Sequence, residues 1–143
     1  MKHSLIRFGP LLLGIAAMAA CSDSTSPGNS PAGSYVAIIF ITTGSSGQTN
    51  QLLIGSSLNM TLATNGTTSG HLHLAASNGN PAFDADMAGT WTRNGNLVDF
   101  TQAADTFVRD MVFTIEPIAQ NTWHLTGDQV FSGTRINLTL ANQ

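Results

Sequence analysis

Three histidines have the residue type and spacing that metal chemistry needs. His71 and His73 are two positions apart, and His124 lies further along the chain. Side chains two apart on a β-strand project from the same face, so a third histidine on a nearby strand would complete a zinc site. The same alternation sets these rings opposite the neighbouring leucines, and no local metal-binding motif surrounds them. We expect solvated surface histidines and no metal cofactor, with a zinc-dependent hydrolase as the alternative.

Other catalytic signatures do not occur in the sequence. It contains no Gly-x-Ser-x-Gly nucleophile elbow and no phosphate-binding glycine loop. The single cysteine, Cys21, precedes the region that is expected to fold. The acidic pair Asp84 and Asp86 does not have the spacing of an EF-hand calcium loop. We therefore expect a binding protein and not an enzyme.

The charge balance narrows the range of partners. The chain carries 5 Lys and Arg against 8 Asp and Glu, a formal net charge of −3. Lys2 and Arg7 lie near the amino terminus. The rest of the chain contains three arginines, all 8 acidic residues and no lysine. A surface this poor in positive charge argues against nucleic acid and against electrostatic docking on anionic lipid. It also excludes Schiff-base lysine chemistry in the folded region.

Apolar residues in the region 33–143 recur at every second position, which is the period of a β-strand. Turn signals such as Asn65-Gly66, Asn94-Gly95 and Ser132-Gly133 separate these runs and indicate hairpins. The pattern predicts an all-β domain of about eight antiparallel strands, with one strand spanning 107–116. An up-and-down meander of that size usually closes into a barrel, which removes its edges. A two-sheet sandwich is the competing architecture.

The inward face of this predicted barrel is apolar. An interior of this size admits one small ligand or is filled by side chains, and aromatic and methionine linings suit apolar ligands. We expect a small apolar ligand among Tyr35, Trp91, Phe107, Met111 and Trp123. The full set of predicted interior residues is Tyr35, Ile39, Ile41, Leu58, Met60, Leu62, Leu72, Leu74, Met87, Trp91, Phe107, Met111, Phe113, Ile115, Trp123, Leu125, Ile136, Leu138 and Leu140.

The alternate face of the first strand is also apolar. Val36, Ile38 and Phe40 alternate with predicted interior residues and would form an outer stripe. Monomeric proteins seldom leave such a patch open, so a loop carrying Leu52-Leu53-Ile54 or Phe83 is expected to fold over it. The alternative is a docking surface for a protein partner or for a second copy of the chain. A protein-binding role, as an inhibitor of an enzyme or as an assembly partner, would use such a surface.

Several short segments resemble the small lipocalin-like lipoproteins of bacteria. These are Gly33-Ser34-Tyr35 at the first strand, the segment 89–96, and Ser132-Gly133 before the last strand. The resemblance covers nearly all of 33–143 and implies a lipocalin-like barrel with a tendency to bind ligands. Lipocalins carry a Gly-x-Trp tryptophan and an arginine near the last strand, where this chain has Tyr35 and Arg135. The resemblance thus implies a ring–guanidinium contact that closes one barrel end.

The amino-terminal segment has the layout of an export signal. Lys2 and Arg7 precede an apolar run, 11–20, that is too short to span a bilayer as a helix. The run ends in Met18-Ala19-Ala20-Cys21, which resembles a bacterial lipobox with methionine where leucine is more common. The resemblance implies cleavage before Cys21, diacylation of its thiol and acylation of the new amino terminus. Two acyl chains are enough for stable membrane attachment.

The domain organisation follows from this signal. Residues 1–20 are the predicted lipoprotein signal peptide, residues 21–32 a flexible Ser-, Pro- and Gly-rich tether, and residues 33–143 one β-barrel domain. A serine after the cysteine, here Ser22, favours the outer membrane in the Gram-negative sorting rule. We expect an exported protein, anchored through Cys21 to the cell envelope and facing the periplasm on the outer membrane.

Overall fold

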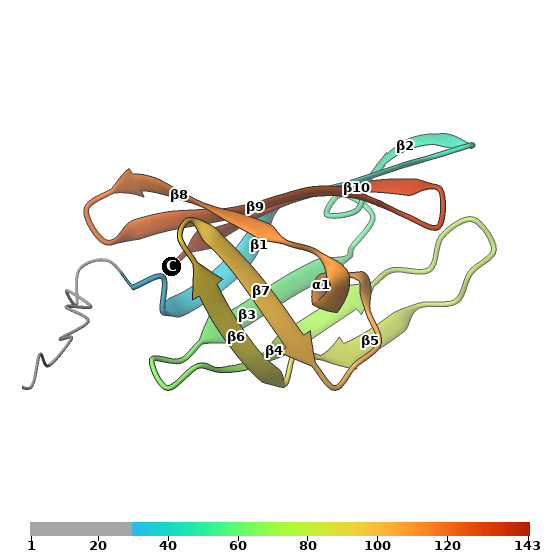
Figure 1. Ribbon diagram of the computed structural model, residues 1–143. Helices are drawn as coiled ribbons and strands as arrows, with labels where there is room; N and C mark the ends of the chain where they lie inside the picture. The colour runs from blue at the N-terminus through green and yellow to red at the C-terminus, as the bar shows by residue number, and fades with distance from the viewer. Residues whose placement is uncertain (1–29) are drawn as a thin grey trace, which may run out of the picture.

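The computed structural model describes residues 30–143, which fold into ten strands and one short helix (Figure 1). Within them, no helix has the length and apolar character needed to cross a membrane. The predicted signal peptide, Cys21 and the tether up to residue 29 lie outside the described residues. The elements are β1 (Gly33–Gly44), β2 (Gly47–Asn50), β3 (Ser57–Leu62), β4 (Thr67–Leu74), β5 (Phe83–Asp86), β6 (Gly89–Asn94), β7 (Leu97–Gln102), α1 (Phe107–Asp110), β8 (Phe113–Ala119), β9 (Thr122–Phe131) and β10 (Thr134–Asn142).

Eight of the strands in this region close into an antiparallel barrel (Figure 1). They pair in the order β10-β9-β8-β7-β6-β4-β3-β1, and β1 pairs back onto β10. The two further strands extend its edges, since β2 pairs with β1 and β5 with β4. The predicted all-β, up-and-down, eight-stranded barrel is confirmed, and its closure excludes the sandwich. The closed barrel surrounds one hydrophobic core.

A β-bulge in β1 turns the second half of that strand over. The pairing of β1 with β10 shifts between Ala37 and Ile39, so Ile38 and Ile39 both face outward at 46% and 40% exposure. Phe40 then points into the core and is 1% exposed. One extra residue in a strand reverses the alternation beyond it. The prediction of Ile39 inside and Phe40 outside was therefore wrong, and Ile41 is only partly buried.

The strand predicted for 107–116 is divided in two. Phe107–Asp110 form the single helical turn α1, and β8 begins only at Phe113. The turn buries Val108 completely and brings the Phe107 ring to 5.6 Å from the Phe40 ring, centroid to centroid. Packing at the barrel end thus overrides the strand preference of these aromatic and β-branched residues. As a result β8 pairs with β7 over two residues only, and α1 lies at this end of the barrel, beside β7 (Figure 1).

The interior of the barrel is filled by side chains. Most predicted interior residues are in the core, whereas Leu74, Trp91, Phe107 and Trp123 are partly buried and pack against it. Val98, Phe100 and Val108 join the core without having been predicted. A barrel packed in this way holds side chains where a hollow barrel would hold a central ligand. The buried apolar residues are Tyr35, Phe40, Leu58, Met60, Leu62, Leu72, Met87, Val98, Phe100, Val108, Met111, Phe113, Ile115, Leu125, Ile136, Leu138 and Leu140.

The bulge predicts losses of stability of very different size for two adjacent truncations. Phe40→Ala removes a buried ring and should lower the free energy of unfolding by about 3–5 kcal/mol. Ile39→Ala trims a side chain that is 40% exposed and should cost about 1 kcal/mol or less. Urea unfolding of residues 22–143 measures both values. A larger loss for Ile39→Ala than for Phe40→Ala would contradict the reversed register of β1.

Candidate functional site

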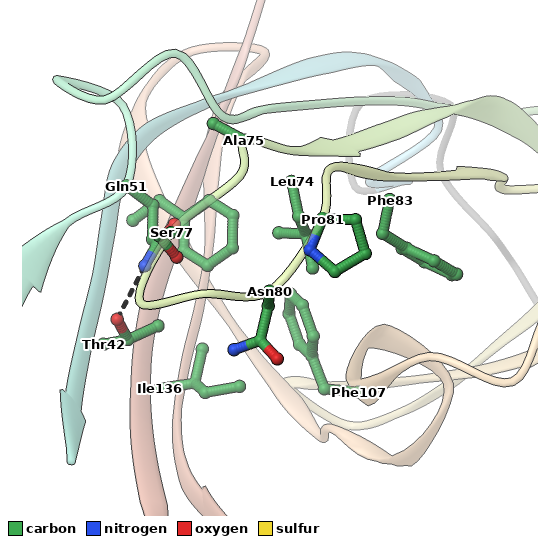
Figure 2. A pocket seen from close by; sticks show the side chains of 11 residues that line it. Thr42, Gln51, Leu74, Ala75, Ser77, Asn80, Pro81, Phe83, Phe107 and Ile136 are labelled. Atoms are coloured by element: carbon green, nitrogen blue, oxygen red, sulfur yellow. Dashed lines mark hydrogen bonds between the residues drawn. The ribbon is translucent and has the colours of Figure 1, made fainter. Parts of the chain in front are cut away.

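An apolar pocket of about 300 Å³ opens at the end of the barrel next to α1 (Figure 2). Its walls come from β1, β10, the end of β4 and α1, and its mouth from the loop 75–82 and the start of β5. None of the eleven lining residues carries a charge. They are Phe40, Thr42, Gln51, Leu74, Ala75, Ser77, Asn80, Pro81, Phe83, Phe107 and Ile136.

The pocket exists because of the two departures from the predicted strands. The bulge turns Phe40 and Thr42 toward the barrel end, and α1 sets Phe107 against Phe40. The loop at the mouth is itself a small hairpin, closed by backbone hydrogen bonds between Ser77 and Asn80 of 3.1 and 2.8 Å. The bulge, the turn α1 and this hairpin therefore hold three parts of the pocket lining in place.

One wall of the pocket carries a chain of hydrogen bonds. The Gln51 side chain, in a residue that is only 8% exposed, donates from Nε2 to Thr42 Oγ1 at 2.8 Å. Its Oε1 accepts from Ser56 Oγ at 3.0 Å, and Ser56 Oγ accepts from the backbone N–H of Ala75 at 2.9 Å. This chain joins β1, the segment after β2 and the loop after β4. It fixes the polar side of an otherwise apolar pocket.

The five residues expected to surround a ligand do not meet at one cavity. Phe107 lines the pocket, whereas Met111 is 1% exposed in the core. Tyr35 is buried and donates from its hydroxyl to the Pro31 carbonyl at 2.6 Å, and burial raises the pKa of this phenol to about 12. Trp91 donates from Nε1 to the Ala63 carbonyl at 2.9 Å.

The partly buried Trp123 lies at the start of β9, at the opposite end of the barrel from Ile136.

The site residues that sequence reasoning missed include Thr42, Gln51 and Asn80. No residue pattern marks them, because their shared position depends on the bulge in β1 and on loop geometry. Only Phe83, which the sequence analysis had singled out as an apolar loop residue, pointed to this end of the barrel.

The expected outer stripe is interrupted. Phe40 is in the core, Val36 is half-buried, and Ile38 is 46% exposed. Of the segments expected to cover the stripe, Phe83 lines the same pocket as Phe40, and Leu52 is partly buried against the core. Leu53 and Ile54 are exposed. A partner or homodimer surface on this face stays a prediction.

The contact implied for Tyr35 and Arg135 does not form. In the pairing of β1 with β10, Tyr35 lies opposite Asn142, and Arg135 lies opposite Thr43. Tyr35 and Arg135 are therefore at opposite ends of this strand pair. Arg135 instead holds Asp128 with two hydrogen bonds of 2.7 and 2.6 Å. This ion pair, on the outer face of the β9–β10 hairpin, lowers the pKa of Asp128.

Two of the histidines form a cluster with aspartates of the neighbouring strand. β4 pairs with β5 so that His73 faces Asp84 and His71 faces Asp86. Asp84 Oδ1 lies 2.9 Å from His71 Nε2 and 2.8 Å from His73 Nδ1, and Asp86 Oδ1 lies 3.4 Å from His71 Nδ1. These contacts tie the outer strand β5 to the barrel beside the pocket mouth.

The stabilising contribution of this cluster depends on pH, and His71 and Asp84 lose their contributions at opposite ends of the pH range. Hydrogen bonds to Asp84 and then Asp86 raise the pKa of His71, and bonds to His73 and His71 lower the pKa of Asp84. The His71 contribution to stability is therefore fully present below its unfolded pKa near 6.5 and is lost as pH rises through the folded value. The Asp84 contribution is present above its unfolded pKa and is lost as pH falls through the folded value.

The three-histidine zinc site is not formed. His124 is on β9, where it faces Glu116 and Ala141, and β8, β7 and β6 separate β9 from β4. Across residues 30–143, no group of three or more His, Cys, Asp or Glu side chains is arranged to hold a metal ion. The zinc alternative was wrong because alternation fixes the face of a strand but not which strands are neighbours.

Comparison with known proteins leaves the pocket as the main guide to function. The eight-stranded antiparallel barrel agrees with the lipocalin-like arrangement that the sequence suggested. No family model matches the chain, and no curated protein or solved structure gives a significant match.

Proposed function

We propose that this protein is an exported, lipid-anchored envelope protein whose barrel binds a small apolar molecule in the pocket beside α1. The observation that carries the proposal is the uncharged pocket of about 300 Å³ at the end of a filled barrel (Figure 2). Sites for small molecules are mostly apolar, concave and commonly found at the mouths of β-barrels. The pocket has this composition and this place.

The size of the pocket supports a compact ligand. An apolar cavity of about 150 Å³ inside a protein is enough to bind benzene. The pocket here has roughly twice that volume, which corresponds to a two-ring molecule. Phe40, Leu74, Phe107 and Ile136 would supply the apolar contacts, while Asn80 and Phe83 lie at the exposed mouth.

Filling the pocket tests this function. Ala75→Phe places a ring in the cavity and should weaken the binding of a fluorescent naphthalene probe by about tenfold or more. Ala76→Phe adds the same ring at the next position, which is exposed and does not line the pocket, and should leave binding unchanged. Fluorescence titration of residues 22–143 measures both. Equal probe binding by the wild type and Ala75→Phe would contradict the proposed site.

The envelope location is the second part of the proposal. It is supported by the lipobox-like Met18-Ala19-Ala20-Cys21 and by the short polar segment between Cys21 and the start of β1 at Gly33. In this arrangement the membrane anchor and the pocket belong to separate parts of the chain. The barrel is then held near the membrane surface while its pocket takes up ligand from the aqueous side.

Lipid labelling tests the anchor. The full chain, expressed in a Gram-negative host with labelled palmitate, should incorporate the label and sediment with the outer membrane. Cys21→Ala should abolish the label because it removes the acylated thiol, and Ser24→Ala in the same segment should retain it. A wild-type protein without label would rule out the anchor and leave the pocket proposal intact.

A further inference from the structure

We infer that the pocket selects uncharged molecules with an apolar body of about two rings and one hydrogen-bonding oxygen, and rejects carboxylates and phosphates. This inference rests on the proposed function and specifies its ligand class. It follows from three properties of the same cavity: the absence of charge in its lining, the free hydrogen-bonding capacity of its polar wall, and its volume.

The lining offers no counterion to a charged ligand. No lining residue is ionisable. The charged residues nearest to them in sequence are already paired: Arg135 with Asp128, Asp84 with His71 and His73, and Arg109 with Asp105 and Asp110. A charge moved from water into such a site loses its hydration without gaining a partner. The region beyond residue 20, with three arginines against 8 Asp and Glu, also repels anions.

The polar wall offers hydrogen bonds to an oxygen. Gln51 uses one of its two amide N–H groups on Thr42 Oγ1, and its Oε1 accepts from Ser56. Thr42 Oγ1 is the acceptor in the first of these bonds, so its own hydroxyl proton is directed elsewhere. The wall can therefore donate to a ligand oxygen from Thr42 or from the second N–H of Gln51. A hydroxyl on the ligand can also donate to Gln51 Oε1.

The arrangement of the pocket sets an orientation for the ligand. Figure 2 shows Thr42 and Gln51 on one side of the cavity, with Leu74, Pro81 and Phe83 on the other and Phe107 near them. The oxygen of a bound molecule would face Thr42 and Gln51, and its ring system would lie against Leu74 and Phe107. An acidic headgroup in that position would be held by donors alone, without a positive charge.

Three probes of one shape test the ligand class. Naphthalene, 2-naphthol and 2-naphthoate share a ring system, and at about pH 7 only the naphthoate is charged, because carboxyl groups ionise near pH 4. Calorimetric or fluorescence titration of residues 22–143 should give the tightest binding for naphthol, with naphthoate at least about tenfold weaker than naphthalene. Naphthoate binding as tight as naphthol would overturn the inference and leave the proposed pocket standing. Failure of all three probes would overturn both.

Variants of Thr42 test the polar wall. Thr42→Val keeps the shape and removes the hydroxyl, so the preference for naphthol over naphthalene should fall severalfold while naphthalene binding is retained. Thr42→Ser restores the hydroxyl and should restore the preference. Thr43→Val, at the next and exposed position, should change neither. Gln51→Leu, combined with Thr42→Val, removes both donors of the wall, and an undiminished preference for naphthol in this double variant would overturn the assignment of this wall.

Discussion

The bulge at Ile38 in β1 is the constraint on which the rest of the structure depends. β1 must pair with β10 to close the barrel, and it also carries β3 and β2 on its other edge. With one residue left over between Ala37 and Ile39, both halves of the strand keep an apolar side chain inward, Tyr35 in the first half and Phe40 in the second. Closure and core packing are thereby satisfied together.

The filled interior moves the site to the end of the barrel. Met111 and the other buried side chains leave no central channel, and β8 meets β7 over only two residue pairs. α1 packs beside β7 at this end, and its Phe107 ring contacts the Phe40 ring. Both rings line the apolar pocket. The outer strand β5 adds Phe83 at the rim and is held by the His71–Asp84 contact. The bulge in β1 and the turn α1 therefore shape both the barrel and the pocket at its end.

Much of the fold could be predicted from the sequence because its signals are local. Alternation and turn pairs such as Ser132-Gly133, where φ is 47° and 81°, predict the strands and their meander without knowledge of distant contacts. The bulge was not predictable in this way, because Ile38, Ile39 and Phe40 are all apolar and either register gives an apolar interior. α1 was missed because a single turn carries no helical periodicity. The site was missed with them, since Thr42 and Gln51 meet only through the bulge and the loop that follows β2.

The central claim is that ligand binds at the barrel end beside α1 and not inside the barrel. Amide and indole correlation spectra of residues 22–143, recorded during titration with 2-naphthol, test it most directly. We expect the shifts to gather at the amides of Thr42, Gln51, Ala75 and Phe107, while the indole N–H signals of Trp91 and Trp123 stay in place. Shifts of the two indole signals with unmoved pocket amides would place the ligand at the other end and contradict the account.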